Sequence, residues 1–255
     1  MTLTLLTLPC LADNYAYLVH DPESGATAVV DVPEAGPILA ALDDRGWHLT
    51  EIWLTHHHHD HITGVPELRA ATGARVTGAA ADAHRLPVLD RAVAAGDSFD
   101  FAGHAVTVAD VSGHTVGHIA FHIAAAKMVF TGDSLMAAGC GRLFEGTPAQ
   151  MWESLSRLAA LPADTLVCSG HEYTASNIRF ALSLEPDNPA LISRSERVAV
   201  ARREGRPTVP SLLSEELATN PFLRANLPQM KAAIGRPSAG DAEAFAEIRA
   251  RKDRF

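Results

Sequence analysis

Apolar residues in the first two thirds of the chain occur in short runs and predict a series of strands. Residues 3–8 are leucines interrupted by threonines, a pattern that suits a first strand. Helices are predicted between the strands at 37–45, 66–72 and 148–160, with Thr147 capping the last one, and a short helix or loop at 79–84. The further predicted strands are 15–20, 26–32, 52–55, 74–77, 99–101, 105–111, 118–123, 128–131 and 165–169.

The pattern changes after about residue 173, where strand-like runs disappear and helical runs replace them. The predicted helices are 176–184, 189–204, 214–219, 228–234 and 241–252. Glycine and proline mark clear breaks at 205–207 and 235–237. We therefore expect an α/β domain over residues 1–173 and a small all-helical domain over residues 174–255.

Composition and charge narrow the class of protein. The chain has 255 residues, of which 47% are hydrophobic and 20% charged, as in ordinary globular proteins. A net charge of -9 argues against a nucleic-acid partner, and no apolar run is long enough to span a membrane. Cys10, Cys140 and Cys168 form no C-x-x-C pair, and the N-terminus has no basic residue or cleavage site typical of export. We expect a cytoplasmic monomer without disulfides.

A run of histidines broken by one aspartate, residues 56–61, follows the apolar run 52–54. Side chains that each need a polar partner are crowded here, and a shared cation is the simplest partner. A purification tag or low-complexity tract is the alternative, but this run is internal and is framed by a strand and by Gly64. In an extended segment His56, His58 and Asp60 would share one side, while His57 and His59 would point away and be structural.

Three more apolar runs end in a turn that presents a histidine or aspartate. These turns are Ser-Gly-His at 112–114, Thr-Gly-Asp at 131–133 and Ser-Gly-His at 169–171. Each one alone is more often an ordinary turn, but four such segments in one chain predict a shared site. The donors are then His56, His58, Asp60, His61, His114, Asp133 and His171.

Seven donors are too many for one ion and suit two divalent metal ions with Asp133 as the bridge between them. Because all the donors are nitrogen or oxygen, zinc is favoured, and iron or manganese is compatible. Asp31 and Thr55 are candidates for orienting the ligands from outside. His118 lies between a turn and a strand, and we expect it to be structural.

The motifs T-H-x-H-x-D-H, G-H-T-x-G-H, F-T-G-D-S and G-H-E-Y, in this order, resemble the metallo-β-lactamase fold superfamily. That resemblance implies an αββα sandwich with the metals at one edge. Further motifs resemble the glyoxalase II family, the hydroxyacylglutathione hydrolases, across nearly the whole chain. They are D-N-Y-A-Y-L at 13–18, A-G-C-G-R-L-F-E-G-T at 138–147, G-H-E-Y-T at 170–174, E-P-D-N at 185–188, T-N-P-F-L-R at 219–224 and R-A-R-K-D at 249–253.

The resemblance implies a metal-dependent thioester hydrolase that converts S-(2-hydroxyacyl)glutathione, chiefly S-D-lactoylglutathione, to glutathione and D-lactate with a metal-bridging hydroxide, a step of methylglyoxal detoxification. One metal would be held by His56, His58 and His114, the other by Asp60, His61 and His171, with Asp133 shared. Asp60 would also orient the hydroxide or take its proton.

The same resemblance implies the residues that hold the glutathione part: Arg142, Phe144, Tyr173, Arg249 and Lys252. Family members often have lysine in place of Arg142 and tyrosine in place of Phe144, so the hydroxyl contact at Phe144 is lost. Arg249 and Lys252 share a face of a predicted helix, which suits an anionic substrate. Taken without the resemblance, they are a solvated basic helix end.

Three alternatives remain for the function. A persulfide dioxygenase of the same fold would hold one iron and consume oxygen. A β-lactam hydrolase is disfavoured because the second metal set lacks cysteine. A non-enzymatic metal-binding protein would close its site with protein ligands, whereas seven donors around two metals leave positions open.

Overall fold

The computed structural model describes residues 3–255. Met1 and Thr2, with which the first predicted domain begins, lie outside the described residues. The chain forms two compact units, one from the chain up to Asp110 together with Gly117–Gly132, the other from Val111–Val116 and Asp133–Phe255. The division into domains near residue 173 rests on a change of element type, and it stays a prediction.

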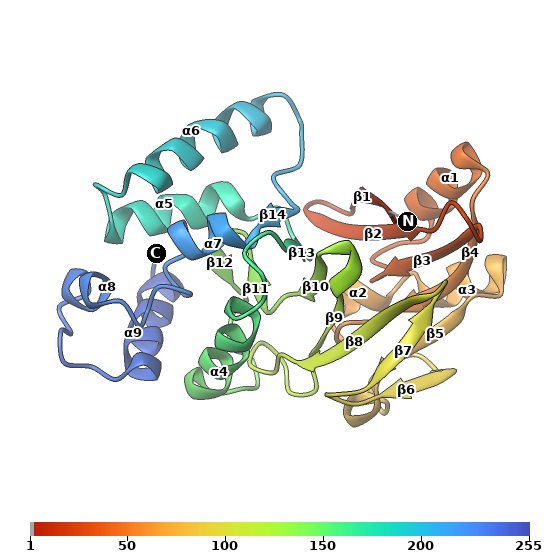
Figure 1. Ribbon diagram of the computed structural model, residues 1–255, viewed down its shortest axis with the longest axis horizontal. Helices are drawn as coiled ribbons and strands as arrows, with labels where there is room; N and C mark the ends of the chain where they lie inside the picture. The colour runs from red at the N-terminus through yellow and green to blue at the C-terminus, as the bar shows by residue number, and fades with distance from the viewer. Residues whose placement is uncertain (1–2) are drawn as a thin grey trace. The chain divides into compact units, whose positions relative to one another are not determined.

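The first unit contains a six-stranded sheet in which the strands follow one another in chain order (Figure 1). The first three strands pair antiparallel and the later ones parallel. The second and third strands are short and almost wholly buried, as their apolar runs predicted, whereas the two edge strands are partly exposed. The strands are β1 (Thr4–Cys10), β2 (Asn14–His20), β3 (Ala26–Val30), β4 (His48–Trp53), β5 (Arg75–Ala79) and β6 (Arg91–Val93).

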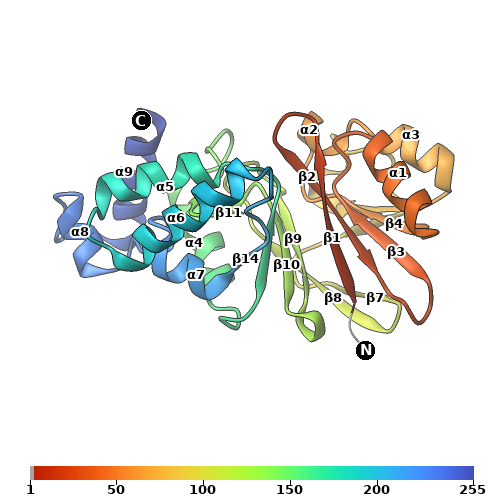
Figure 2. The ribbon, with the colours of Figure 1, turned by 90° about the horizontal axis from the view of Figure 1, so that it is seen from above.

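Helices α1 (Gly36–Arg45) and α3 (Val65–Thr72) supply the crossovers between the parallel strands and cover one face of this sheet (Figure 2). The buried Ile38 of α1 and Leu68 of α3 pack into one cluster with Ile52 of β4. Both helices end at a glycine in the left-handed conformation, Gly46 and Gly73, where a side chain would be strained. The predicted helices at 37–45 and 66–72 are confirmed.

A second, antiparallel group of strands faces the other side of the first sheet in the same unit. Trp53 on β4 is fully buried, and its ring lies 5.4, 5.2 and 5.6 Å from the rings of Phe99, Phe101 and Phe121. These aromatic contacts fix the two sheets face to face. The strands are β7 (Ser98–Phe101), β8 (His104–Asp110), β9 (Ile119–Ile123) and β10 (Met128–Gly132), with the short turns η1 (Ala80–Asp82) and η2 (Ala124–Ala126) beside them.

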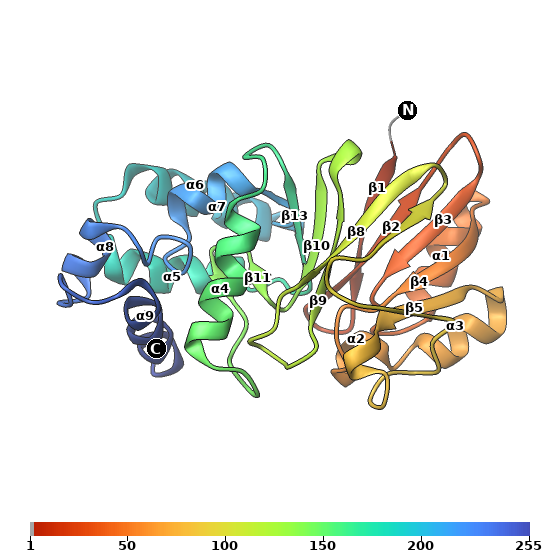
Figure 3. The same cartoon turned by 60° about the horizontal axis from the view of Figure 1, so that its bottom comes forward.

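The second unit is mainly helical. Helix α4 begins at the predicted cap, since Thr147 Oγ1 accepts from Gln150 N at 3.2 Å and Gln150 Oε1 accepts from Thr147 N at 2.9 Å. Helices α4 and α9 pack together with the rings of Trp152 and Phe245 6.3 Å apart (Figure 3). The elements are α4 (Pro148–Ala159), α5 (Thr174–Leu184), α6 (Pro189–Arg203), α7 (Leu213–Thr219), α8 (Pro228–Ala233), α9 (Asp241–Asp253) and the short strands β11 (Leu135–Met136), β12 (Gly139–Cys140), β13 (Leu166–Ser169) and β14 (Ser211–Leu212).

Two local predictions were wrong. The segment after β4 is extended only to His58, because helix α2 (His59–Ile62) begins there, and Asp60 and His61 lie on a helical turn. The part after residue 173 is not purely helical either, because β14 pairs antiparallel with β13. A two-residue strand carries no periodicity, so its sequence gave no signal. Within residues 3–255, every helix is too short or too polar to cross a membrane.

Candidate metal centre

The seven predicted donors all lie just after a strand. His56 and His58 follow β4, His114 follows β8, Asp133 follows β10, and His171 follows β13. Asp60 and His61 lie on α2, within one turn of the end of the extended segment. Strand ends fix backbone positions well, so this arrangement lets short side chains meet without long flexible stems.

Asp31 holds the donors of the first unit in place. It is 3% exposed and follows β3 with a positive φ of 58°, a conformation that aspartate and asparagine tolerate better than most residues. Its carboxylate accepts from Thr55 N at 2.9 Å, Thr55 Oγ1 at 2.8 Å and His61 Nδ1 at 2.8 Å. Asp31 and Thr55 therefore contact His61 and His56, two of the predicted donors, and their role in orienting metal ligands stays a prediction.

These hydrogen bonds decide which ring nitrogen faces outward. A carboxylate can only accept, so His61 carries its proton on Nδ1 and a lone pair on Nε2. The Thr55 hydroxyl gives its proton to Asp31 and therefore accepts from His56 Nδ1 at 3.0 Å. His56 is then the same tautomer. Neutral imidazoles with the lone pair on Nε2 are the form that binds a metal ion.

Three further side chains steady the segment around these donors. Asn14 Nδ2 donates to Asp60 O at 2.9 Å and to Asp60 Oδ2 at 3.0 Å. His57 Nδ1 lies 2.8 Å from the buried carboxylate of Asp82, consistent with its predicted structural role. His118 is fully buried and stacks on His56, with ring centroids 4.5 Å apart. Asn14 lies in a motif that the sequence singled out, but nothing in the sequence pointed to Asp82.

His114, a donor of the second unit, is oriented by a backbone group instead. His114 Nδ1 lies 2.7 Å from the Arg142 carbonyl, which only accepts, so the lone pair of His114 is also on Nε2. The Oδ2 atom of Asp133 lies 3.4 Å from His114 Nε2 and 3.3 Å from His171 Nε2. Two ligands of one zinc ion are about 3.3 Å apart, since each lies about 2.0–2.1 Å from the metal. One carboxylate oxygen therefore has ligand spacing to two histidines, as a bridge requires.

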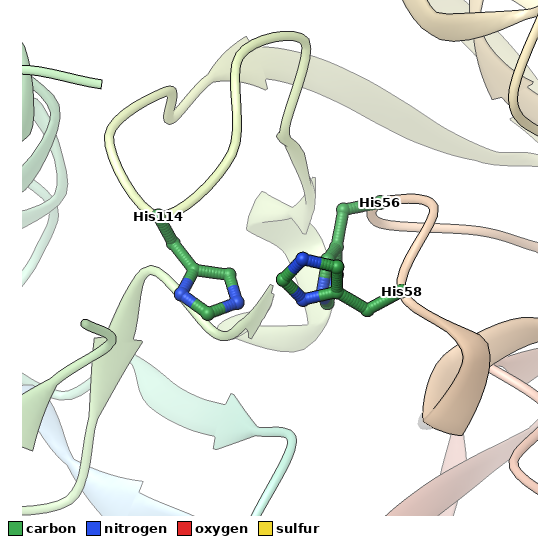
Figure 4. Close-up of side chains that lie close together, drawn as sticks. All are labelled: His56, His58 and His114. Carbon is green, nitrogen blue, oxygen red and sulfur yellow. The ribbon is translucent and has the colours of Figure 1, made fainter. Parts of the chain in front are cut away.

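Potential ligand atoms within 4.8 Å of one another occur in three groups: His56, His58 and His114; Asp60, His61 and His171; and Asp31, His56 and His61. Figure 4 draws the first group, with His56 and His58 on the segment after β4 and His114 on the loop after β8. The third group is better explained as support than as a metal site, because Asp31 already receives the His61 Nδ1 proton. The chemistry of the donors fits divalent metal ions.

The residues predicted to bind the substrate differ in their exposure and in the contacts that they already make within the protein. The side chain of Arg142 is 62% exposed, and the exposed Phe144 ring meets His114 edge to face with centroids 5.3 Å apart. Tyr173 stacks on His171 at 4.7 Å and is partly exposed. Arg249, by contrast, is 6% exposed and donates to Cys140 O at 3.1 Å and to Asp253.

Lys252 is the half-buried member of this set. Its Nζ lies 5.4 and 5.5 Å from the ring centroids of Phe180 and Phe255 and 3.4 Å from Ser176 O. Burial holds the pKa of its ammonium below the ordinary value, and the neighbouring Arg249 and Arg179 lower it further, while Asp253 opposes them. An added anion would relieve this repulsion between cations.

Comparison with known proteins agrees with the fold. The metallo-β-lactamase superfamily model matches residues 13–171, and the model for the hydroxyacylglutathione hydrolase C-terminus matches residues 172–255. The solved structure of ETHE1 from Myxococcus xanthus is 25% identical, covers 99% of this chain and 98% of its own, and has a TM-score of 0.67. That of the BLEG-1 B3 metallo-β-lactamase is 18% identical, covers 86% and 99%, and also scores 0.67, which shows the fold.

With its two-sheet unit, its C-terminal helices and its cluster of histidines and aspartates, the chain belongs to the metallo-β-lactamase superfamily. A hydroxyacylglutathione hydrolase of Cereibacter sphaeroides is 67% identical over all 255 residues of both chains. One of Ruegeria pomeroyi is 64% identical over the same full length. Within the superfamily, the chain is a member of the hydroxyacylglutathione hydrolase family.

Proposed function

We propose that this protein hydrolyses the thioester of S-(2-hydroxyacyl)glutathiones, chiefly S-D-lactoylglutathione, to glutathione and D-lactate, and so serves methylglyoxal detoxification. The observation that carries the proposal is the identity of 67% along the whole length of a hydroxyacylglutathione hydrolase. The match to that family's C-terminal model over residues 172–255 supports the same substrate class.

We infer that two zinc ions are held by seven residues, His56, His58 and His114 for one ion, Asp60, His61 and His171 for the other, and Asp133 for both. The spacing of 3.4 and 3.3 Å from Asp133 Oδ2 to His114 and His171 supports the bridge. Nitrogen and oxygen donors without cysteine favour zinc over softer ions, and metal analysis distinguishes it from iron or manganese.

Bound divalent ions would lower the pKa of a coordinated water toward neutrality and polarise the thioester carbonyl. The role of the protein is to keep its donors in one protonation state and direction. Asp31 fixes the His61 tautomer, and Asn14 fixes the direction of the Asp60 carboxylate. Asp60, so held, orients the attacking water or takes its proton. The leaving thiolate has a pKa of about 8.5, so it needs little help from a general acid.

For the substrate, we infer that the anionic glutathione part binds to Arg142, Tyr173, Arg249 and Lys252, with Phe144 supplying an apolar edge. The depressed pKa of Lys252 among neighbouring cations supports this, since a carboxylate bound there gains more than it would from an isolated lysine. Arg249 already donates to Cys140 O and Asp253, so its part in binding is shared with a structural one.

We further infer a catalytic part over residues 1–173 and a substrate-binding part over residues 174–255, in a cytoplasmic monomer. The ranges of the two matching family models support the division. Cys10, Cys140 and Cys168 are all free thiols, which supports a reducing compartment. Burial raises the pKa of Cys10 and of Cys140 to about 11, so burial also makes these two thiols unreactive at neutral pH.

The test is the release of free thiol from S-D-lactoylglutathione by purified, zinc-loaded protein, with metal analysis on the same sample. We expect D-lactate and thiol in equal amounts and two metal ions per chain. Asp133→Asn should abolish turnover, whereas Asp44→Asn, at an exposed position on α1, should leave it unchanged. Thiol release no faster than with Asp133→Asn would overturn the proposal, and one iron per chain with oxygen consumption on glutathione persulfide would replace it.

A further inference from the structure

The short hairpin of β11 and β12 is bound by helical side chains at every residue from Met136 to Cys140. Four side chains do this through the hairpin backbone. Asn220 Nδ2 donates to Met136 O at 3.1 Å and to Gly139 O at 2.9 Å. Asn177 Nδ2 donates to Ala137 O at 3.1 Å, and Arg249 donates to Cys140 O at 3.1 Å. Glu216 Oε2 accepts from Ala138 N at 2.8 Å.

These side chains come from three different helices of the second unit and are deeply buried. Asn177 lies on α5, Glu216 on α7, and Arg249 on α9, while Asn220 directly follows the last residue of α7. Glu216 and Asn220 are fully buried, and Asn177 and Arg249 are each 6% exposed. Buried amides and carboxylates are costly unless their hydrogen bonds are complete, so such a set specifies one hairpin position.

The hairpin itself has a backbone that needs this support. Ala138 at its turn has a positive φ of 54°, which is unfavourable for a residue with a Cβ. Gly139 packs so tightly on Asn177 that a Cβ there would overlap the Asn177 amide. The remaining carboxylate oxygen of Glu216 accepts from Ser211 Oγ at 2.7 Å and pairs with the buried Arg194, which fixes the direction of the Glu216 carboxylate.

The hairpin lies directly between two parts of the metal centre. It begins two residues after Asp133 and ends two residues before Arg142, whose carbonyl accepts from His114 Nδ1. Gly141 N donates to Ser134 O at 3.1 Å, and Phe144 N donates to His114 O at 3.1 Å, so the segment after the hairpin is tied back to both. A shift of the hairpin would therefore move the Arg142 carbonyl, which sets the tautomer of His114.

We propose that Asn220 and Glu216 are positioning residues for the metal centre, and that they act through the hairpin on His114 and Asp133. The inference rests on the proposed metal centre. The C-terminal helices thereby do more than hold the substrate: they set the geometry of the metal ligands in their own unit. Loss of the Asn220 amide would leave Met136 O and Gly139 O without their donor and loosen the hairpin at both ends.

The test compares Asn220→Ala with Asn188→Ala. Asn188 is a matched control because its side chain also makes three hydrogen bonds to backbone, to Ala218 O, Ala190 N and Leu191 N, but none to the hairpin. Zinc affinity is measured by competition with a chromophoric chelator, and the visible spectrum of the cobalt-substituted protein is recorded. We expect Asn220→Ala to bind the weaker zinc ion about tenfold less tightly and to alter the cobalt spectrum.

Asn188→Ala should lower the unfolding temperature of the metal-free protein yet keep the zinc affinity and the cobalt spectrum of the wild type. If Asn220→Ala does not fold, Asn177→Ala, which removes the single bond to Ala137 O, should show the same change to a smaller degree. Zinc affinity and cobalt spectrum unchanged in the folded variants would overturn the positioning role. A wild-type protein that binds no zinc would instead overturn the proposed metal centre.

Discussion

The predicted metal donors fall into two sets by the compact unit to which they belong, and the two sets are held by different means. The first set is His56, His58, Asp60 and His61, and the second set is His114, Asp133 and His171. In the first unit, His61 and Asp60 are oriented by other side chains, Asp31 and Asn14. In the second unit, His114 is oriented by a backbone carbonyl, that of Arg142. A ligand held by side chains depends on the identity of its partners, whereas a ligand held by backbone depends on the path of the chain. The two sets should therefore fail under different kinds of substitution.

The sharpest way to break the second set without touching the first is Gly141→Ala. A Cβ at this position would overlap Asp133 O and would lie 2.8 Å from His114 Nδ1. Because the overlap is with backbone, it cannot be relieved by a rotamer change, and Asp133 and His114 must move. We expect zinc affinity to fall by about a hundredfold and turnover to be lost, measured by chelator competition and thiol release.

The matched control for this prediction is Gly36→Ala. Gly36 lies at the start of α1, a Cβ there meets nothing within 4 Å, and its backbone φ is not positive. Alanine at this helical position should leave zinc affinity unchanged. A folded Gly141→Ala variant with wild-type zinc affinity would contradict the view that backbone position controls the second set.

Asp31→Asn is the corresponding way to break the first set. Asparagine keeps the shape and tolerates the positive φ. Its NH₂ group, however, would face the Thr55 and His61 groups that now donate hydrogen bonds to Asp31, so at least one of these bonds would be lost. We expect zinc affinity to fall by about tenfold to a hundredfold and kcat to fall with it. The unfolding temperature should also drop, because a buried charged acceptor is lost.

Asp21→Asn is a suitable control for Asp31→Asn. Asp21 is equally buried at 3% exposed and follows a strand of the same sheet, but its carboxylate accepts from Ser24 N at 2.9 Å, away from the donors. This variant should lose some stability and keep its metals. If both variants lose zinc to the same extent, Asp31 acts through general stability and not on its ligand.

Lys252→Ala extends the comparison from the metals to the substrate. We expect KM to rise about tenfold with kcat nearly unchanged, because a charge that binds the glutathione part does so equally in ground and transition states. Arg249→Ala should instead lower kcat as well, since Arg249 also donates to the hairpin at Cys140 O. Steady-state kinetics on S-D-lactoylglutathione separate the two outcomes.

Arg254→Ala removes the same charge two residues away, at the end of α9, and serves as the control for both variants. Its KM should stay within twofold of the wild type. Equal rises in KM for Lys252→Ala and Arg254→Ala would mean that net charge, and not a specific contact, attracts the substrate.

The contrast between the two donor sets also explains what the sequence could and could not reveal. Elements with a clear hydrophobic pattern, such as the apolar run of β2 and the amphipathic helix α4, were predicted within one or two residues. Asp31 could be named as a candidate because it directly follows the apolar residues at 29–30. The role of the Arg142 carbonyl could not be found, because any residue has a carbonyl and its direction depends on the folded chain.

Long-range pairing of buried polar side chains was equally hidden. Asn220 is 84 residues from Met136 and 81 from Gly139, and no local pattern in the sequence records such a pairing. Helix α2 was missed for a related reason. A four-residue helix has too few positions to show a helical period, and histidine is a weak helix former that gave no signal.

The smallest expected effect comes from Phe144→Tyr, which adds a side-chain hydroxyl beside His114 and leaves the backbone unchanged. The Phe144 ring is 62% exposed and lies edge to face on His114, so the added hydroxyl meets no packed core. If the glutathione part binds beside Phe144, one new hydrogen bond contributes about 0.5–1.5 kcal/mol, which lowers KM by about two- to tenfold. Zinc affinity should not change, because the His114 Nδ1 bond to Arg142 O is untouched.

Val116→Thr adds a hydroxyl at another exposed position of the same unit and controls for a general gain in polarity. A KM for Phe144→Tyr equal to that of the wild type would place the substrate away from this ring.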